Sequence, residues 1–219
     1  MGTRFESPNE SNVLLFLTAK GTRISFQEGE AIFTQGDAAD CVFYIEHGII
    51  KKSYVASSGK ERVIAICKAR EFLGIACVAG QRDRRHTATA MNGCSLVRVE
   101  KSVMLRMIAE QPGLADLLIS FLIDRNNHYQ EHVREHLFYP SEKRLARTLL
   151  DLCEIGTDGK DEVPKISQET LAEIVGTTRS RVNYFMNKFR DNGFVEYGDK
   201  IRVQRSKLQG VLDDSLTER

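Results

Sequence analysis

Residues 167–190 read SQETLAEIVGTTRSRVNYFMNKFR. Ser167 is a good N-cap for a first helix, and Thr177 or Thr178 can cap a second one. Gly176 lies between them, where a turn requires a positive φ that glycine adopts easily. Small Ala172 lets two helices cross closely. Apolar residues recur on one face of each predicted helix: Leu171, Ile174, Val175, Val182, Phe185, Met186 and Phe189. These offsets together predict a helix-turn-helix.

The exposed face of the second helix is basic and polar, since no acidic residue lies between Arg179 and Arg190. Arginine can read guanine with two hydrogen bonds, asparagine can read adenine, and lysine suits phosphates. We therefore predict a DNA-binding helix, with Arg179 as its main base reader and Arg181 and Lys188 as phosphate contacts. An ordinary helical hairpin with a solvated basic face is the alternative. The predicted DNA-binding residues are Gln168, Thr177, Thr178, Arg179, Ser180, Arg181, Asn183, Tyr184 and Lys188.

A hairpin signature follows this helix. Gly193 ends the helix, and the segments FVEY (residues 194–197) and KIRV (residues 200–203) flank a Gly198-Asp199 turn. Such a hairpin is the wing of a winged helix-turn-helix. Upstream, leucines at helical spacing predict another helix that begins after Pro140, and the polar segment GTDGKDEV (residues 156–163) predicts an exposed loop.

A long helix is predicted between these regions, because no Pro or Gly interrupts the chain between Gly113 and Leu137. Residues at alternating spacings of three and four form a seam typical of a coiled coil, in which the polar Asn126 can fix the register. The seam predicts a homodimer interface, although a helix packed on its own domain would show a similar pattern. The predicted interface residues are Ala115, Ile119, Leu122, Asn126, Tyr129 and Val133, with His136 continuing the spacing.

The first half of the chain is typical of β-structure. Short β-prone segments are separated by glycine-containing turns, which predicts a small barrel or sandwich. The predicted strands are residues 42–45, 49–55, 62–66, 88–91 and 96–99. Around Ser102 the period becomes helical, and Pro112 closes that helix.

Composition restricts the class of protein. The chain has 219 residues and a net charge of +1, so DNA contacts must come from a local basic face. No stretch reaches the roughly 20 apolar residues of a membrane span, and the N-terminus has no secretory signal pattern, so we expect a cytoplasmic protein that does not associate with membranes. The five cysteines are scattered, which favours buried reduced thiols over disulfides or a zinc ribbon, while leaving a redox-sensing thiol open.

The whole chain resembles the CRP/FNR family, the catabolite-activator and fumarate-nitrate-regulator type of bacterial transcription factor. The segments FQEGE (26–30), QGD (35–37), VFYIEHGII (42–50) and SSGKE (57–61) resemble the double-stranded β-helix of a cyclic-nucleotide-binding domain. EFLGI (71–75) resembles the start of its phosphate-binding cassette, and KISQETLAEIVGTTRSRV (165–182) resembles the family's helix-turn-helix.

The resemblance implies an α+β fold with three regions. These are an N-terminal jelly-roll-like sensor (1–112), a dimerisation helix (113–138) and a C-terminal winged helix-turn-helix (139–219). It also implies a homodimer that binds a two-fold symmetric site in double-stranded DNA. Family members that activate transcription touch RNA polymerase, and the loop at residues 156–163 is the corresponding surface. In the recognition helix, Arg179 matches the family's leading arginine, whereas Ser180 replaces a common glutamate and Tyr184 a common second arginine.

Departures from the family pattern concern the effector. Cyclic-AMP binders place a glutamate directly after the cassette glycine, but here Ile75 follows Gly74. They also have an Arg-Ser pair, whereas GQRDRRHTATA (80–90) has none, so Arg84 and Arg85 either meet another anion or lie in a basic surface loop. Tyr129 and Gln130 occupy positions where a base would be read. We expect an effector other than cyclic AMP, or none, with Gly74, Ile75, Arg84, Arg85 and Tyr129 as candidate effector residues.

No cofactor is predicted. The first forty residues contain no cysteine, unlike the iron–sulfur branch of the family. His128, Glu131 and His132 form an H-x-x-E-H pattern, which is a zinc motif in some peptidases. A metal-dependent hydrolase is therefore an alternative function, although a polar interface helix gives the same pattern. Such a hydrolase would need a further ligand and a substrate cleft.

Overall fold

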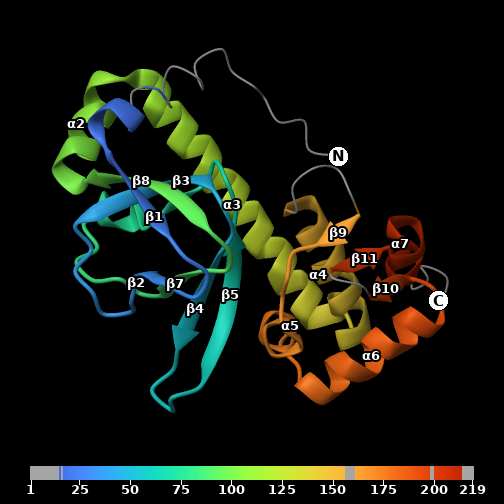
Figure 1. Cartoon of the computed structure of the whole chain (residues 1–219). Coiled ribbons are helices and arrows are strands. Elements are labelled where there is room, and N and C mark those ends of the chain that lie inside the picture. Colours follow the sequence, from blue (N-terminus) through green and yellow to red (C-terminus); the bar gives the residue numbers. More distant parts are fainter. Residues whose placement is uncertain (1–14, 16, 156–160, 198–199, 214–219) are drawn as a thin grey trace. The chain divides into compact units, whose positions relative to one another are not determined.

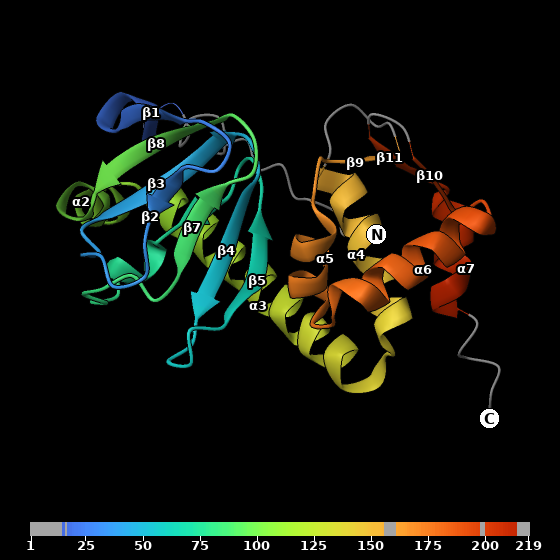
Figure 2. The same ribbon diagram turned by 60° about the horizontal axis from the view of Figure 1, so that its bottom comes forward.

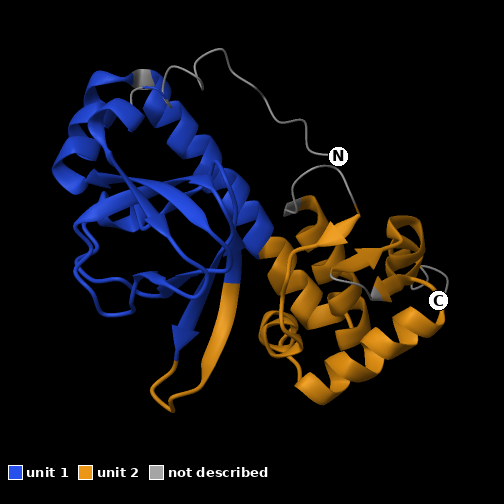
Figure 3. Ribbon diagram, viewed as in Figure 1, with its two compact units in different colours: residues 1–55, 65–129 blue, residues 56–64, 130–219 orange. Residues whose placement is uncertain are grey.

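A computed structural model describes Leu15 and residues 17–155, 161–197 and 200–213 (Figure 1). Most of the loop predicted at residues 156–163, the Gly198-Asp199 turn and the N-terminal segment considered for a signal lie outside these residues. The chain divides into two compact units, one of Met1–Val55 and Ala65–Tyr129, the other of Ala56–Ile64 and Gln130–Arg219 (Figure 3). In the described residues, no helix is long and apolar enough to cross a membrane.

The N-terminal half of the chain contains two four-stranded sheets, with strand orders β1-β8-β3-β6 and β2-β7-β4-β5. All five strands predicted from the sequence are present, together with three that were not predicted, β1, β2 and β6. The strands are β1 (Thr22–Phe26), β2 (Ala31–Phe33), β3 (Cys41–His47), β4 (Ile50–Val55), β5 (Glu61–Cys67), β6 (Phe72–Leu73), β7 (Thr87–Ala90) and β8 (Cys94–Glu100), with a short 3-10 helix η1 (Ile75–Cys77) after β6.

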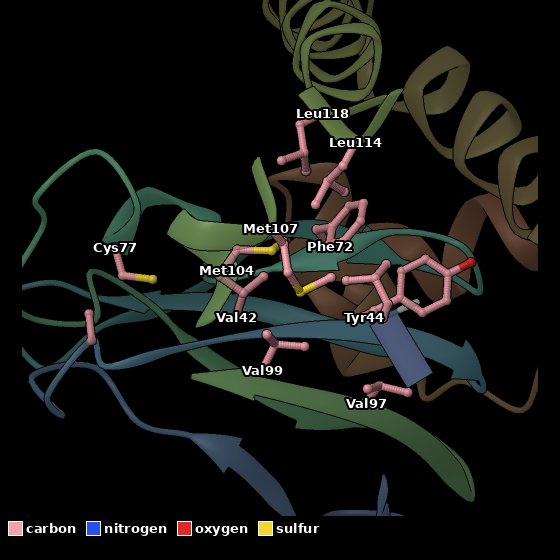
Figure 4. Close-up of a cluster of buried hydrophobic side chains, with 12 residues drawn as sticks. Val42, Tyr44, Phe72, Cys77, Val97, Val99, Met104, Met107, Leu114 and Leu118 are labelled. Atoms are coloured by element: carbon pink, nitrogen blue, oxygen red, sulfur yellow. The ribbon is translucent and has the colours of Figure 1, made fainter. Parts of the chain in front are cut away.

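β3 is the central strand of this fold, because its residues from Cys41 to Ile45 are all buried. Phe43 faces a core between the two sheets, which includes Ile32 from β2 and Ile50 from β4. Tyr44 faces the opposite side and a second core, which Figure 4 shows between the sheet and helical side chains. A strand buried on both faces reads as a continuous apolar run, which is the pattern of VFYI in the sequence.

Two helices cover the second core. They are α2 (Lys101–Glu110) and α3 (Pro112–Phe138), so Pro112 both ends the first helix and opens the long one. Met104 and Met107 of α2 and Leu114 and Leu118 of α3 are buried in this core (Figure 4). In the N-terminal half of α3, only one side of the helix packs against the second core.

The second unit contains a helix-turn-helix with a three-stranded wing (Figure 2). The predicted loop at residues 156–163 is partly wrong, since Glu162 and Val163 form a strand that pairs with β11 and Val163 is fully buried. The elements are α4 (Ser141–Ile155), β9 (Glu162–Val163), α5 (Gln168–Val175), α6 (Arg179–Asp191), β10 (Val195–Tyr197), β11 (Ile201–Val203) and α7 (Arg205–Asp213), of which α7 was not predicted.

Candidate nucleic-acid interface and effector site

Three capping residues set the geometry of the helix-turn-helix. Ser167 Oγ accepts a 3.0 Å hydrogen bond from the backbone N–H of Thr170 at the start of α5. Gly176 ends α5 with φ 68°, in the left-handed region that favours glycine. Of the two candidate threonines, Thr178 caps α6, because its Oγ1 accepts from the N–H of Arg181 at 3.3 Å. The structure confirms the predicted cap Ser167 and the turn at Gly176, and it decides between the two threonines that the sequence left open.

α6 has one buried and one exposed face. Val182, Phe185, Met186 and Phe189 are buried, which fixes the opposite side chains toward solvent. The structure exposes seven of the nine predicted DNA-binding residues, while Gln168 and Thr177 are partly buried. Tyr184 is 65% exposed. The seven exposed residues are Thr178, Arg179, Ser180, Arg181, Asn183, Tyr184 and Lys188.

Arg144 of α4 supports the turn between α5 and α6. Its Nε donates a 3.0 Å hydrogen bond to the carbonyl oxygen of Val175, the last residue of α5. Its Nη1 donates at 3.0 Å to the carbonyl oxygen of Tyr139, just before Pro140. One guanidinium thus connects the end of α3 to the helix-turn-helix, and the sequence pattern gave no sign of this role.

Ion pairs hold several of the basic side chains in this unit. Lys188 Nζ lies 2.8 Å from Glu142 Oε1 in the first turn of α4, and this hydrogen bond raises the pKa of Lys188. In the wing, Glu162 binds both Lys200 and Arg202. The sequence showed the charges but not the pairings, because the partners lie far apart along the chain.

Arg84 corrects the prediction of a basic surface loop. Its side chain is buried at 4% exposure, with the guanidinium 4.5 Å above the ring of Phe33. Nη2 donates to the carbonyl oxygen of Cys41 at 2.8 Å, whereas Nε is buried without a hydrogen-bond partner. Within the described residues, the hydrogen bonds of Arg84 go to the carbonyl oxygens of Gly74 and Cys41 and to the Cys41 thiol, and none goes to a carboxylate. Arg85, the next residue, is exposed as predicted for a surface loop.

Gly74 lies beside this arginine, whereas Ile75 packs elsewhere. Gly74 has φ 71°, and a Cβ added there would come within 2.0 Å of Arg84 Nη1, so only glycine fits. Ile75 packs on the second core. Its side chain has no group that could accept a hydrogen bond from a ribose hydroxyl.

Further ionisable residues, missed from the sequence, gather near the same strands. Lys52 pairs in register with buried Ala88, as Ile50 does with Ala90, so Lys52 shares the inner face of β4 with Ile50. Burial and the nearby charges of Lys52 and Arg85 lower the pKa of His86 to about 4, so His86 is neutral at pH 7. The alternation of side chains along β4 could have predicted that Lys52 lies on the inner face, but no local sequence signal predicted that His86 lies near it.

Tyr129 takes part in a network that involves α3. Its Oη accepts a 2.7 Å hydrogen bond from Arg125, which also donates to Glu71 at 2.8 Å. Arg125 Nη1 lies 3.5 Å from the thiol of Cys67. The predicted effector residue Tyr129 is therefore tied to the end of β5 through an arginine that the sequence did not single out.

Three apolar residues of the predicted dimer seam on α3 are exposed in a single chain. Ile119 is 56% exposed, Leu122 48% and Val133 58%. Asn126 is also exposed, whereas Ala115 is partly buried. Exposed apolar residues at seam spacing are what an unpartnered coiled-coil face looks like.

The histidines of α3 do not form a metal site with other residues. In the described part of the chain, no group of three His, Cys, Asp or Glu side chains is close enough to hold a metal ion. Glu131 pairs with Arg134, and His132 Nδ1 lies 3.9 Å from Glu135. Nothing supports the hydrolase alternative.

The five cysteines are free and buried, which confirms the prediction of buried thiols. Burial raises the pKa of both Cys41 and Cys153 to about 11. Few thiolates form at neutral pH under these conditions, and the thiolate is the reactive species.

Comparison with known proteins agrees with this geometry. Residues 23–111 match the cyclic nucleotide-binding domain, and residues 143–210 match the Crp-like helix-turn-helix domain. The global nitrogen regulator of Synechococcus elongatus is 28% identical over 78% of this chain and 79% of its own length. The CRP-like cAMP-activated global transcriptional regulator of Mycobacterium tuberculosis is 24% identical over 87% of each chain.

A solved structure shows the same fold. FixK2 from Bradyrhizobium japonicum superposes with a TM-score of 0.76 at 17% identity, over 87% of this chain and 96% of FixK2. Both domain models match in the order and at the positions where the sheets and the helix-turn-helix lie. The chain therefore belongs to the CRP/FNR family of transcription regulators.

Proposed function

We propose that this regulator is a homodimer that reads a two-fold symmetric DNA site with its two α6 helices. The observation that carries this proposal is the exposed basic and polar face of α6 on a helix whose other face is fully apolar and buried. Recognition helices of this kind enter the major groove with their N-terminal residues toward the base edges. Regulators of this family bind DNA and act as dimers.

Arg179 is the main base reader in this proposal. It occupies the first turn of α6, is exposed, and forms no ion pair within the described residues. A bidentate contact of arginine to guanine is worth about 1–3 kcal/mol of discrimination. The other residues that we propose to contact DNA are Gln168, Thr177, Thr178, Ser180, Arg181, Asn183, Tyr184 and Lys188.

The partner of α3 in this proposal is a second copy of the chain. The seam combines exposed Ile119, Leu122 and Val133 with one polar position, Asn126. An apolar seam with a single polar residue suits two identical helices, since the polar groups then meet each other at one register. We also propose the three regions expected from the sequence: a sensor (1–112), a dimerisation helix (113–138) and a DNA-binding domain (139–219).

The sensor is controlled by an anion other than cyclic AMP or by no effector at all. Arg84 is buried without a carboxylate partner, and burying a charge is costly unless it is compensated. Lys52 adds a second cation on the inner face of β4. An anionic effector would compensate both charges, and Gly74, Ile75, Arg85 and Tyr129 complete its proposed surroundings. Where transcription is activated, residues 156–163 would contact RNA polymerase.

Two measurements test the proposal. Native mass spectrometry of the purified protein should give the mass of two chains and report any retained small molecule. Selection of binding sites from randomised DNA should recover an inverted repeat with half-sites about one helical turn apart. A monomer that recovers a single half-site would contradict the dimer, and failure to enrich any motif would contradict sequence-specific binding.

A further inference from the structure

The basic side chains of the second unit differ in whether they form an ion pair. Arg179 and Arg181, in the first turn of α6, form no ion pair within the described residues. Several basic residues elsewhere in α6, in the wing and in α7 are paired with acids. The pairs are Lys188–Glu142 at 2.8 Å, Lys200–Glu162 at 3.0 Å, Arg202–Glu162 at 3.4 Å and Arg205–Asp161 at 2.6 Å.

Glu162 forms ion pairs with two basic side chains through its single carboxylate. Oε2 lies 3.0 Å from Lys200 Nζ and Oε1 lies 3.4 Å from Arg202 Nε. The side chain of Glu162 is 19% exposed, whereas those of Lys200 and Arg202 are 60% and 69% exposed. The two basic side chains are therefore mostly exposed to solvent, whereas the carboxylate between them is mostly buried.

The position of Glu162 is fixed by the wing sheet. Glu162 on β9 pairs in register with Arg202 on β11, and cross-strand neighbours on an antiparallel pair lie side by side. The hydrogen bond from Lys200 lowers the pKa of Glu162, so the carboxylate is ionised at neutral pH. The pairing is thus built into the fold of the wing.

We propose that Glu162 is a specificity-determining residue that withholds Lys200 and Arg202 from DNA phosphates. Sequence-independent affinity depends on how many phosphates the protein neutralises. A wing whose cations are bound to Glu162 neutralises few, and the carboxylate itself repels the backbone. Binding then depends more on the first turn of α6, where Arg179 is the proposed base reader and Arg181 the proposed phosphate contact. This inference rests on the proposed DNA binding through α6 and the wing.

Glu162→Gln tests the inference, and Glu196→Gln is its matched control. Glu196 lies on β10, is exposed, and also faces Arg202 in register, but it forms no ion pair within the described residues. Both variants remove one negative charge from the wing, and only Glu162→Gln releases the two cations. Affinity for a labelled duplex of mixed sequence is measured over a series of KCl concentrations, with thermal unfolding to verify that each variant folds.

We expect Glu162→Gln to tighten binding to mixed-sequence DNA by about tenfold at low salt and to steepen the salt slope by about 1.8 per protomer, or about 0.9 for each released cation. Glu196→Gln should leave the slope unchanged. Equal slopes for the two variants would overturn the inference.

A second pair of substitutions keeps the test decisive if Glu162→Gln does not fold. In the otherwise unchanged chain, Lys200→Gln with Arg202→Gln should leave the salt slope as it is, because these cations are already withheld. A slope that falls by about 1.8 per protomer would show that they contact phosphates and would refute the inference. The proposed function fails separately if the protein without substitutions binds its selected site no more tightly than mixed-sequence DNA.

Discussion

Arg125 on α3 and Glu71, which precedes β6, form an ion pair with 2.8 Å between Nη1 and Oε2. Both side chains are largely buried, at 17% and 19% exposure. Arg70, the residue before Glu71, has φ 71°, a conformation that costs a non-glycine residue free energy. This strained turn places Glu71 beside the helix that carries the proposed dimer seam. The ion pair therefore connects the sensor strands to α3.

The first prediction concerns this pair. Arg125→Gln should lower the free energy of unfolding by about 1–3 kcal/mol, because it leaves the largely buried carboxylate of Glu71 without its charged partner. Arg134→Gln on the same helix, which removes an exposed pair with Glu131, should cost at most about 1 kcal/mol. Urea denaturation at neutral pH compares the two. Equal losses would mean that the Arg125 pair contributes no more than a surface contact.

The second prediction concerns the effector. Cyclic AMP should not increase DNA affinity, because Ile75 packs on the second core and offers no acceptor to a ribose hydroxyl. Titration of labelled duplex DNA with and without the nucleotide measures the effect. A tenfold gain in affinity, about 1.4 kcal/mol of coupling, would contradict the prediction.

The third prediction concerns the dimer. Leu122→Asp should dissociate it, because a charge would be buried without a partner in the seam, while the monomer should fold since Leu122 is 48% exposed in a single chain. Ser120→Asp adds the same charge nearly opposite on the helix, about 200° away at 100° per residue, and should leave the dimer intact. Sedimentation velocity measures both masses. A Leu122→Asp protein that stays dimeric would place the interface elsewhere.

The fourth prediction concerns Arg144. Arg144→Met keeps the apolar stem but removes the hydrogen bonds to the carbonyl oxygens of Val175 and Tyr139. We expect a loss of about 1–3 kcal/mol in unfolding free energy, because partly buried carbonyls lose charged donors, and weaker DNA binding because the turn before α6 is no longer held. Lys143→Met is the control, since its 3.4 Å contact goes to α7. Unchanged DNA affinity in a destabilised Arg144→Met protein would limit Arg144 to a structural role.

The sequence predicted features that depend on local residue order. Gly176 and Thr178 indicated the helix-turn-helix because a positive φ and an N-cap are properties of single positions. β3 was found because it is apolar throughout. β9 was missed because it has two residues, and Val163 alone is apolar there.

Contacts between distant residues could not be predicted in the same way. The sequence left open whether Arg84 meets an anion or lies in a surface loop, and only the fold shows that its side chain turns inward over Phe33. Glu162 and Lys200 are 38 residues apart, and they come close because β9 pairs with β11, which begins directly after Lys200. Periodicity identifies the exposed face of a helix, but it does not show which of its charges are already paired.

The final prediction separates base reading from phosphate binding on α6. Arg179→Ala should flatten the preference among half-site sequences while leaving much of the sequence-independent affinity, because the loss of a bidentate contact to guanine removes discrimination at one position. Selection from randomised DNA with the Arg179→Ala protein measures this. A recovered motif identical to that of the unchanged protein at every position would move the reading role to Arg181 or Asn183.

Lys188 provides the contrast. As a phosphate contact, Lys188→Ala should weaken binding to all sequences alike and reduce the salt slope by at most about 0.9 for each half-site. The 2.8 Å pair with Glu142 makes the loss smaller than that limit, because DNA must compete with the carboxylate. Glu142→Gln should therefore raise the slope toward the limit without changing the selected motif. A changed motif in Glu142→Gln would mean that Lys188 also touches base edges, because a residue that meets only phosphates carries no sequence information.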